Sequence, residues 1–131
     1  MKNKINVSLP KDWVWKSFDE CIIPKTVSTR KIPEKLYLKE GLYPIVDQGA
    51  KLIVAYTNEK AAFYQHENPV IVFGDHTRIL KFIDFDFAIG ADGTKIIHPN
   101  ANEVYPKYFY YILMATPIPN DGYNRHFKYL K

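Results

Sequence analysis

Cysteine is nearly absent from this sequence, which has one, Cys21, in 131 residues. A lone cysteine cannot form an internal disulfide, and zinc sites built from several cysteines are excluded. Apolar runs are also short, and none approaches the roughly 18 residues that a membrane-spanning helix needs. The basic start Met1–Lys4 is not followed by the apolar stretch of a signal peptide. Together these absences predict a cytoplasmic protein.

The excess of positive charge is small, with a net charge of +4 and a pI near 9.0. Residues 1–40 carry a net charge of +4, residues 41–100 of −2 and residues 101–131 of +2. If the basic ends of the chain meet in space, they form one positive face that can bind a polyanion. The alternative is that the early lysines only solvate an irregular surface.

The composition is that of an ordinary globular protein, and the length predicts a single domain over residues 1–131. Nine prolines and six glycines divide the chain into short pieces whose β-branched and aromatic residues favour strands. Antiparallel meanders are favoured over βαβ units because no helix-length segments separate the pieces. Asp92-Gly93 between two apolar runs predicts a hairpin. The expected strands are Tyr43–Val46, Leu52–Tyr56, Ala61–Tyr64, Val70–Phe73, Arg78–Ile83, Phe87–Ala91 and Lys95–His98.

One helix is expected, over residues 105–116, with a proline suited to its first turn and prolines at positions 117 and 119 to end it. A single helical turn is expected within residues 18–23. An extended, basic segment with few apolar anchors is expected over residues 24–41. The residues expected on the buried face of the helix are Tyr105, Phe109, Ile112, Leu113 and Thr116.

Residues that could support catalysis do not form a recognisable pattern. The four histidines lack metal-ligand spacing. Two residues separate Asp92 from Lys95, whereas a nuclease strand places one residue between acid and lysine so that both share a face. No nucleophile-elbow motif is present. Gly90-Ala91-Asp92-Gly93 has the G-x-x-G pattern of KH domains, but its strand-like flanks favour a turn. We therefore expect no enzymatic activity and no metal site.

Two polar, basic turns are candidates for DNA contact. The first follows an apolar strand and contains His76, Thr77 and Arg78; the second, residues 123–128, interleaves aromatic residues with Asn124 and Arg125. Arginine suits guanine or phosphate and asparagine suits adenine. The alternatives are a turn closed by Asp75 with Arg78 in a surface salt bridge, and a terminal segment with its polar residues in water.

These runs resemble the target recognition domain of type I restriction–modification specificity subunits, in an order and spacing that extend over nearly the whole chain. The segments that carry the resemblance are Trp15 with Ser17-Phe18, residues 41–49 (GLYPIVDQG), 70–78 (VIVFGDHTR), 89–95 (IGADGTK) and 122–130 (GYNRHFKYL).

The resemblance implies an α/β (α+β) fold with a curved, mostly antiparallel sheet and recognition loops that face DNA. In this family each such domain reads one half of a bipartite site in double-stranded DNA, and two long helices dock the methyltransferase subunits. The domain is non-catalytic and has no cofactor, since S-adenosylmethionine, ATP and Mg²⁺ belong to the methyltransferase and restriction subunits. The sequence contains one such domain and ends where the family's spacer helix would start.

The expected DNA-binding residues fall into two groups. Five basic residues would hold phosphates or guanines, and polar residues would read bases. The alternative function is a stand-alone interaction or inhibitory module that acts through protein partners. The basic group is Lys51, Arg78, Lys95, Arg125 and Lys128, and the polar group is Gln48, His76, Thr77 and Asn124; His126 is a further expected DNA-binding residue.

Overall fold

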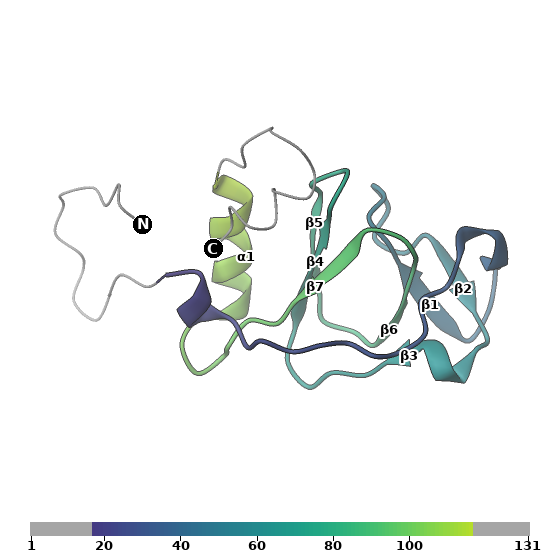
Figure 1. Ribbon diagram of the computed structural model, residues 1–131, viewed down its shortest axis with the longest axis horizontal. Helices are drawn as coiled ribbons and strands as arrows, with labels where there is room; N and C mark the ends of the chain where they lie inside the picture. The colour runs from purple at the N-terminus through teal and green to yellow at the C-terminus, as the bar shows by residue number, and fades with distance from the viewer. Residues whose placement is uncertain (1–16, 117–131) are drawn as a thin grey trace, which may run out of the picture.

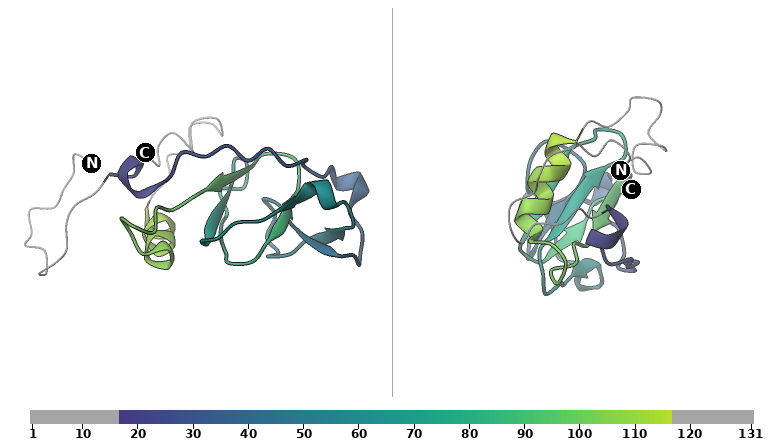
Figure 2. Two further views of the ribbon diagram at one scale, coloured as in Figure 1. Left: turned by 90° about the horizontal axis from the view of Figure 1, so that it is seen from below. Right: turned by 90° about the vertical axis from the view of Figure 1, so that its left-hand side faces the viewer.

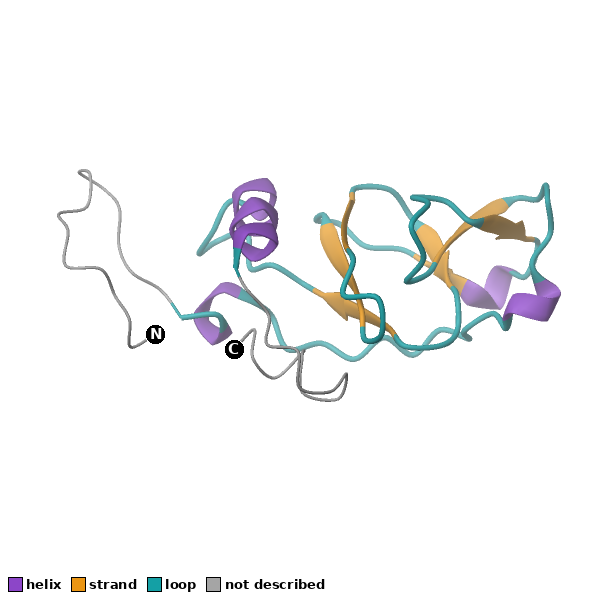
Figure 3. Ribbon diagram, turned by 90° about the horizontal axis from the view of Figure 1, so that it is seen from above, coloured by secondary structure: helices purple, strands orange, loops and turns teal. Residues whose placement is uncertain are grey.

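The computed structural model describes residues 17–116, which form short strands joined by longer connections (Figure 3). Within these residues, one α-helix, α1 (Pro106–Ala115), follows seven strands; two 3₁₀ turns precede the first strand, and a third lies between the second and third strands. The strands are β1 (Tyr43–Val46), β2 (Ala55–Thr57), β3 (Phe63–Tyr64), β4 (Val70–Gly74), β5 (Leu80–Ile83), β6 (Phe87–Ile89) and β7 (Thr94–Ile97). The 3₁₀ turns are η1 (Asp19–Cys21), η2 (Glu34–Leu36) and η3 (Lys60–Ala62).

The strands form two sheets, which corrects the expectation of one curved sheet. The four-stranded sheet has the order β2-β1-β6-β3, and the three-stranded sheet has the order β5-β4-β7. All pairs are antiparallel except β1 with β6, which is parallel. The fold is therefore mixed α+β, with the three-stranded sheet between α1 and the four-stranded sheet (Figure 1).

The hairpin expected at Asp92-Gly93 is wrong, because β6 and β7 belong to different sheets. A turn-forming dipeptide sets the local backbone but not the partners of its flanking strands. Here β6 pairs with β1 and β3, whereas β7 pairs with β4. The Asp92-Gly93 turn thus carries the chain from one sheet to the other.

Strand β1 and the α-helix lie where the sequence predicts them, whereas other boundaries shift. The expected strand Ala61–Tyr64 begins as the 3₁₀ turn η3. The strand expected from Arg78 begins at Leu80, since Arg78 has a left-handed backbone with φ of 61°. The strand expected at Leu52–Tyr56 is Ala55–Thr57.

Strand β4 is buried on both faces and organises the core. On one face, Ile71 and Phe73 pack with Phe109 and Leu113 of α1. On the other, Val70 and Val72 belong to a cluster that includes residues of the four-stranded sheet. This explains the continuous apolar run of β4, and the left-hand view of Figure 2 shows the same order of layers.

The helix buries a narrower stripe than the sequence predicts. Phe109 and Leu113 are buried, but Tyr105 is 75% exposed and Ile112 is 42% exposed. The prolines at positions 117 and 119, expected to end the helix, lie outside the described residues. The helical turn within residues 18–23 is confirmed as η1.

The segment before β1 runs along both sheets (Figure 1). Single β-bridges join Ile22 to Pro99, Ile32 to Gly90 and Leu38 to Tyr56. The side chain of Ile32 is 1% exposed and anchors this segment. The segment is therefore attached at intervals along its length.

Candidate nucleic-acid interface

Three turns that are distant in sequence meet around the side chain of Gln48. The Oε1 atom of Gln48 accepts hydrogen bonds from the backbone N–H groups of His76 (2.9 Å) and Thr77 (3.2 Å). Its Nε2 atom donates to the carbonyl oxygen of Asp92 (2.8 Å). The hydroxyl of Thr77 donates to the carbonyl oxygen of Gln48 (2.7 Å). We call residues 47–52, 74–79 and 90–95 together the turn junction.

Glycines leave the space that Gln48 occupies. A Cβ atom on Gly74 would lie 2.6 Å from the Cβ of Gln48 and 2.3 Å from the hydroxyl of Thr77. Gly93 has φ of 71°, in the left-handed region that favours glycine, and its Cβ would lie 2.5 Å from Nε2 of Gln48. The two glycines and the glutamine therefore form one packed arrangement.

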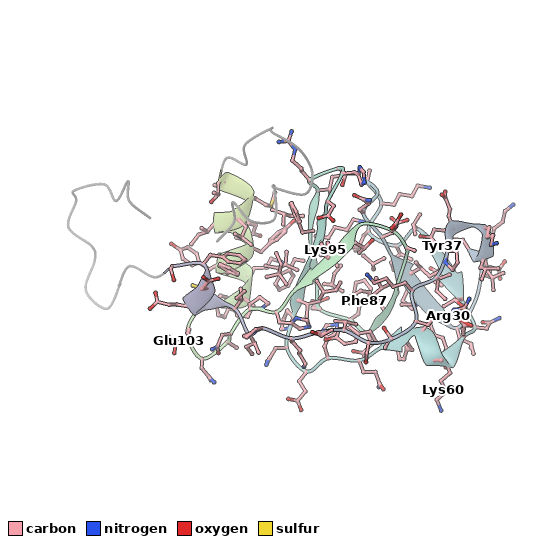
Figure 4. The ribbon with its side chains drawn as sticks, in the orientation of Figure 1. Arg30, Tyr37, Lys60, Phe87, Lys95 and Glu103 are labelled. Atoms are coloured by element: carbon pink, nitrogen blue, oxygen red, sulfur yellow. The ribbon has the colours of Figure 1, made fainter. Side chains whose placement is uncertain are left out.

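Asp75 and Lys95 form an ion pair within the turn junction. The Asp75 carboxylate is 3.6 Å from Nζ of Lys95, and its own backbone N–H donates to the carbonyl oxygen of Gly93. Lys95 lies on β7 and its side chain is about half exposed (Figure 4). Asp75 therefore joins the 74–79 turn to β7.

Arg78 has a strained backbone for a residue with a side chain. Its φ of 61° costs roughly 1 kcal/mol relative to glycine. The backbone N–H of Arg78 donates to the carbonyl oxygen of Gly74 (2.8 Å), which closes the turn. A strained residue held in a turn is a candidate for function.

Tyr37 and Asp47 stabilise the 47–52 turn through hydrogen bonds that the sequence did not predict. The hydroxyl of Tyr37 donates to the Asp47 carboxylate (2.8 Å), and burial together with that bond raises the pKa of Tyr37. The second oxygen of Asp47 accepts from the backbone N–H of Gly49 (2.8 Å). An aspartate two residues before a glycine is a sequence signal for such a turn.

The structure brings six of the ten expected DNA-binding residues into the turn junction. Lys51 and His76 are exposed, and Arg78 is partly buried. The other four, Asn124, Arg125, His126 and Lys128, lie outside the described residues. The six are Gln48, Lys51, His76, Thr77, Arg78 and Lys95.

A second polar cluster lies around Tyr64 and beside a cavity of about 520 Å³. The hydroxyl of Tyr64 is 2.6 Å from Nε2 of His98, and both residues are buried. Burial lowers the pKa of His98 to about 4, with smaller contributions from Lys25 and His66. The ring nitrogens of His66 are each 2.7 Å from a carbonyl oxygen, of Asn68 and Phe85. The histidine rings of this cluster bond to a tyrosine hydroxyl and to backbone carbonyls, so the cluster has a structural role.

Within residues 17–116, His, Cys, Asp and Glu side chains form no group of three or more that could hold a metal ion. In the same part of the chain, no helix is long and apolar enough to cross a membrane.

Comparison with known proteins shows a partial similarity to a restriction-system protein. No protein-family model matches the sequence, and no solved structure matches it. The chain is 37% identical over 76 residues to the specificity subunit of the type I restriction enzyme EcoR124I/EcoR124II of Escherichia coli. That match covers 56% of this chain and 19% of the E. coli protein, so the chain spans about a fifth of its relative's length. This similarity supports a domain like part of a type I specificity subunit.

Proposed function

We propose that this chain is a sequence-specific double-stranded DNA-binding domain that reads one half of a bipartite site for a type I restriction–modification system. The observation that carries the proposal is the turn junction. There, the side chains of Gln48 and Thr77 join three turns by hydrogen bonds, and these turns carry the basic residues Lys51, Arg78 and Lys95. The partial similarity to a type I specificity subunit supports the same assignment.

Within this proposal, some residues of the turn junction position the turns and others contact DNA. Gln48 and Thr77 use their side chains to join the turns, which fixes the relative positions of the other residues. Lys51 and Lys95 supply positive charge for phosphates, and Lys95 is restrained by Asp75. His76 and Arg78 are the proposed contacts to base edges, where arginine pairs with guanine in a bidentate way.

Asn124, Arg125, His126 and Lys128 remain proposed DNA contacts on sequence grounds alone. We propose that methylation and cleavage belong to methyltransferase and restriction subunits, and that this chain supplies specificity without catalysis or a cofactor of its own. The partial similarity to a type I specificity subunit supports this division.

Selection of bound duplexes from a random library tests the proposal, followed by affinity measurements across a salt series. We expect one preferred sequence, with log affinity falling against log salt with a slope of about −4 to −5 for roughly four to six phosphate contacts. The control is Lys60→Ala, an exposed lysine on η3 outside the turn junction. Equal binding to all duplexes, or affinity independent of salt, would contradict the proposal.

The second candidate function, an interaction module, is favoured by the exposed apolar surface of α1. Contiguous apolar exposure is typical of protein interfaces. Tyr111 and Met114 are more than half exposed and line a groove of about 510 Å³ with Leu52 and Phe82. Nζ of Lys107 lies 4.6 Å from the centre of the Phe82 ring in this groove.

Co-sedimentation with a methyltransferase subunit, in the presence and absence of DNA, separates the two functions. An interaction module binds the subunit without DNA and loses binding in the Met114→Ser variant. A DNA-binding domain retains its duplex preference in that variant, because Met114 lies on α1, outside the turn junction.

A further inference from the structure

A buried lysine, Lys81, bonds the backbone of the 47–52 turn. Lys81 lies on β5 and is only 5% exposed. It shares the buried face of the strand with Ile83, which is fully buried, because alternate residues of a strand point the same way. An ammonium group in this position loses most of its hydration, so its donors need protein acceptors.

Both acceptors of Lys81 belong to the 47–52 turn. Nζ of Lys81 donates to the carbonyl oxygen of Asp47 (2.7 Å) and to that of Lys51 (2.5 Å). These two carbonyls stand at either end of the segment that contains Gln48. Burial lowers the pKa of Lys81 below its usual range, and the nearby Asp47 carboxylate opposes that effect.

We infer that Lys81 is a positioning residue that fixes the 47–52 turn and, through Gln48, the 74–79 turn that we propose reads DNA. The inference rests on the proposed function only in its last step. The earlier steps concern contacts within the protein. Lys81 positions the 47–52 turn, this turn places Gln48, and Oε1 of Gln48 accepts hydrogen bonds from the backbone N–H groups of His76 and Thr77. A buried lysine used in this way specifies one loop conformation where an apolar residue would leave several.

Amide hydrogen exchange of the purified chain, without DNA, tests whether Lys81 positions the two turns. Lys81→Met keeps the apolar stem and removes the ammonium group. We expect exchange at the His76 and Thr77 amides to become at least tenfold faster, while the amides of β4 stay protected. The matched control is Ile83→Val, which alters the same strand face by one methyl group and leaves both hydrogen bonds to the turn.

The inference is overturned if the His76 and Thr77 amides of Lys81→Met exchange at the parent rate, or if the increase is the same across β4 and the turns. If Lys81→Met does not fold, Lys81→Leu, which also lacks a donor, is measured instead, and the same two results overturn the inference. Selected duplex libraries then test the last step. We expect Lys81→Met to broaden the preferred sequence. A parent chain that binds no DNA removes the proposed function and leaves the exchange result standing.

Discussion

The turn junction and the cluster around Tyr64 both hold loops together with buried or half-buried polar groups, but they present different surfaces. Around Gln48, internal hydrogen bonds leave Lys51, His76 and Lys95 exposed or half exposed. Around Tyr64, the ring nitrogens of the two histidines face a hydroxyl and two backbone carbonyls inside the protein.

The two regions differ in whether their polar side chains bond to groups within the protein or lie at the surface. In the turn junction, the side chain of Gln48 bonds backbone groups of the neighbouring turns, and the basic side chains of Lys51 and Lys95 lie at the surface. In the Tyr64 cluster, the buried ring of His98 bonds the Tyr64 hydroxyl and burial lowers its pKa, so protonation of His98 acts on stability. We therefore expect pH to act chiefly through the Tyr64 cluster and salt to act chiefly through the turn junction.

Acidification should give the largest effect, through His98. Because the pKa of His98 is lowered to about 4 in the folded protein, the unfolded chain binds a proton first as the pH falls below its ordinary value. The contribution of His98 to stability is complete above about pH 6.5 and is lost as the pH falls to about 4, by up to roughly 3 kcal/mol. Denaturant unfolding between pH 7.5 and 4.5 measures it.

The control for this prediction is His98→Gln, which keeps an acceptor for the Tyr64 hydroxyl but does not titrate. The variant should show a shallower loss of unfolding free energy over the same pH range. Identical pH dependence in the parent and the variant would assign the acid sensitivity to other groups.

Removal of the Gln48 side chain should cost about 1–3 kcal/mol of unfolding free energy, because two backbone N–H groups and one carbonyl lose their partner. Gln48→Leu keeps the side-chain volume near Gly74 and removes the hydrogen bonds. Gln48→Glu keeps the acceptor oxygens and should lose less. Thermal unfolding of these variants beside Gln65→Leu, an exposed glutamine by the other cluster, checks the prediction; equal losses at both sites would contradict the role of Gln48.

Substitutions of Arg78 distinguish the effect of backbone strain on stability from the effect of the guanidinium group on DNA binding. Arg78→Gly relieves the strain of the left-handed backbone, so it should be about 1 kcal/mol more stable than Arg78→Ala. Both variants lack the guanidinium group and should bind the selected duplex equally weakly, about 1–3 kcal/mol below the parent with relaxed preference at one base. If the glycine variant is the less stable of the two, or if either binds as the parent does, this assignment of Arg78 is wrong.

The sequence predicts local features of the fold better than the pairing of its strands. Tyr43–Val46 and the α-helix follow from local patterns, namely an apolar strand before a turn and a proline at the start of an amphipathic run. The parallel pairing of β1 with β6 depends on residues about forty positions apart, and the Asp92-Gly93 dipeptide carries no information about it.

The candidate site shows the same limit. The polar turn at residues 74–78 could be recognised because it interrupts an apolar run. The role of Gln48 in joining the turns could not be recognised from the sequence, since its hydrogen-bond partners come from two other turns. Lys81 is the clearest case: alternation along β5 places it on the buried face, but a lysine in sequence is ordinarily expected to face solvent.

The smallest expected effect is at Lys51, where side chain and backbone have separate roles. The carbonyl oxygen of Lys51 accepts from Lys81, and Lys51→Ala retains that carbonyl. Because the side chain is exposed, stability should stay within about 0.5 kcal/mol of the parent. If Lys51 holds a phosphate, affinity should fall similarly on every duplex and the salt slope should shrink by about one. Lys60→Ala removes the same charge from η3 and should leave the slope unchanged. An equal change in both variants would mean that net charge, and not the turn junction, sets the affinity for DNA.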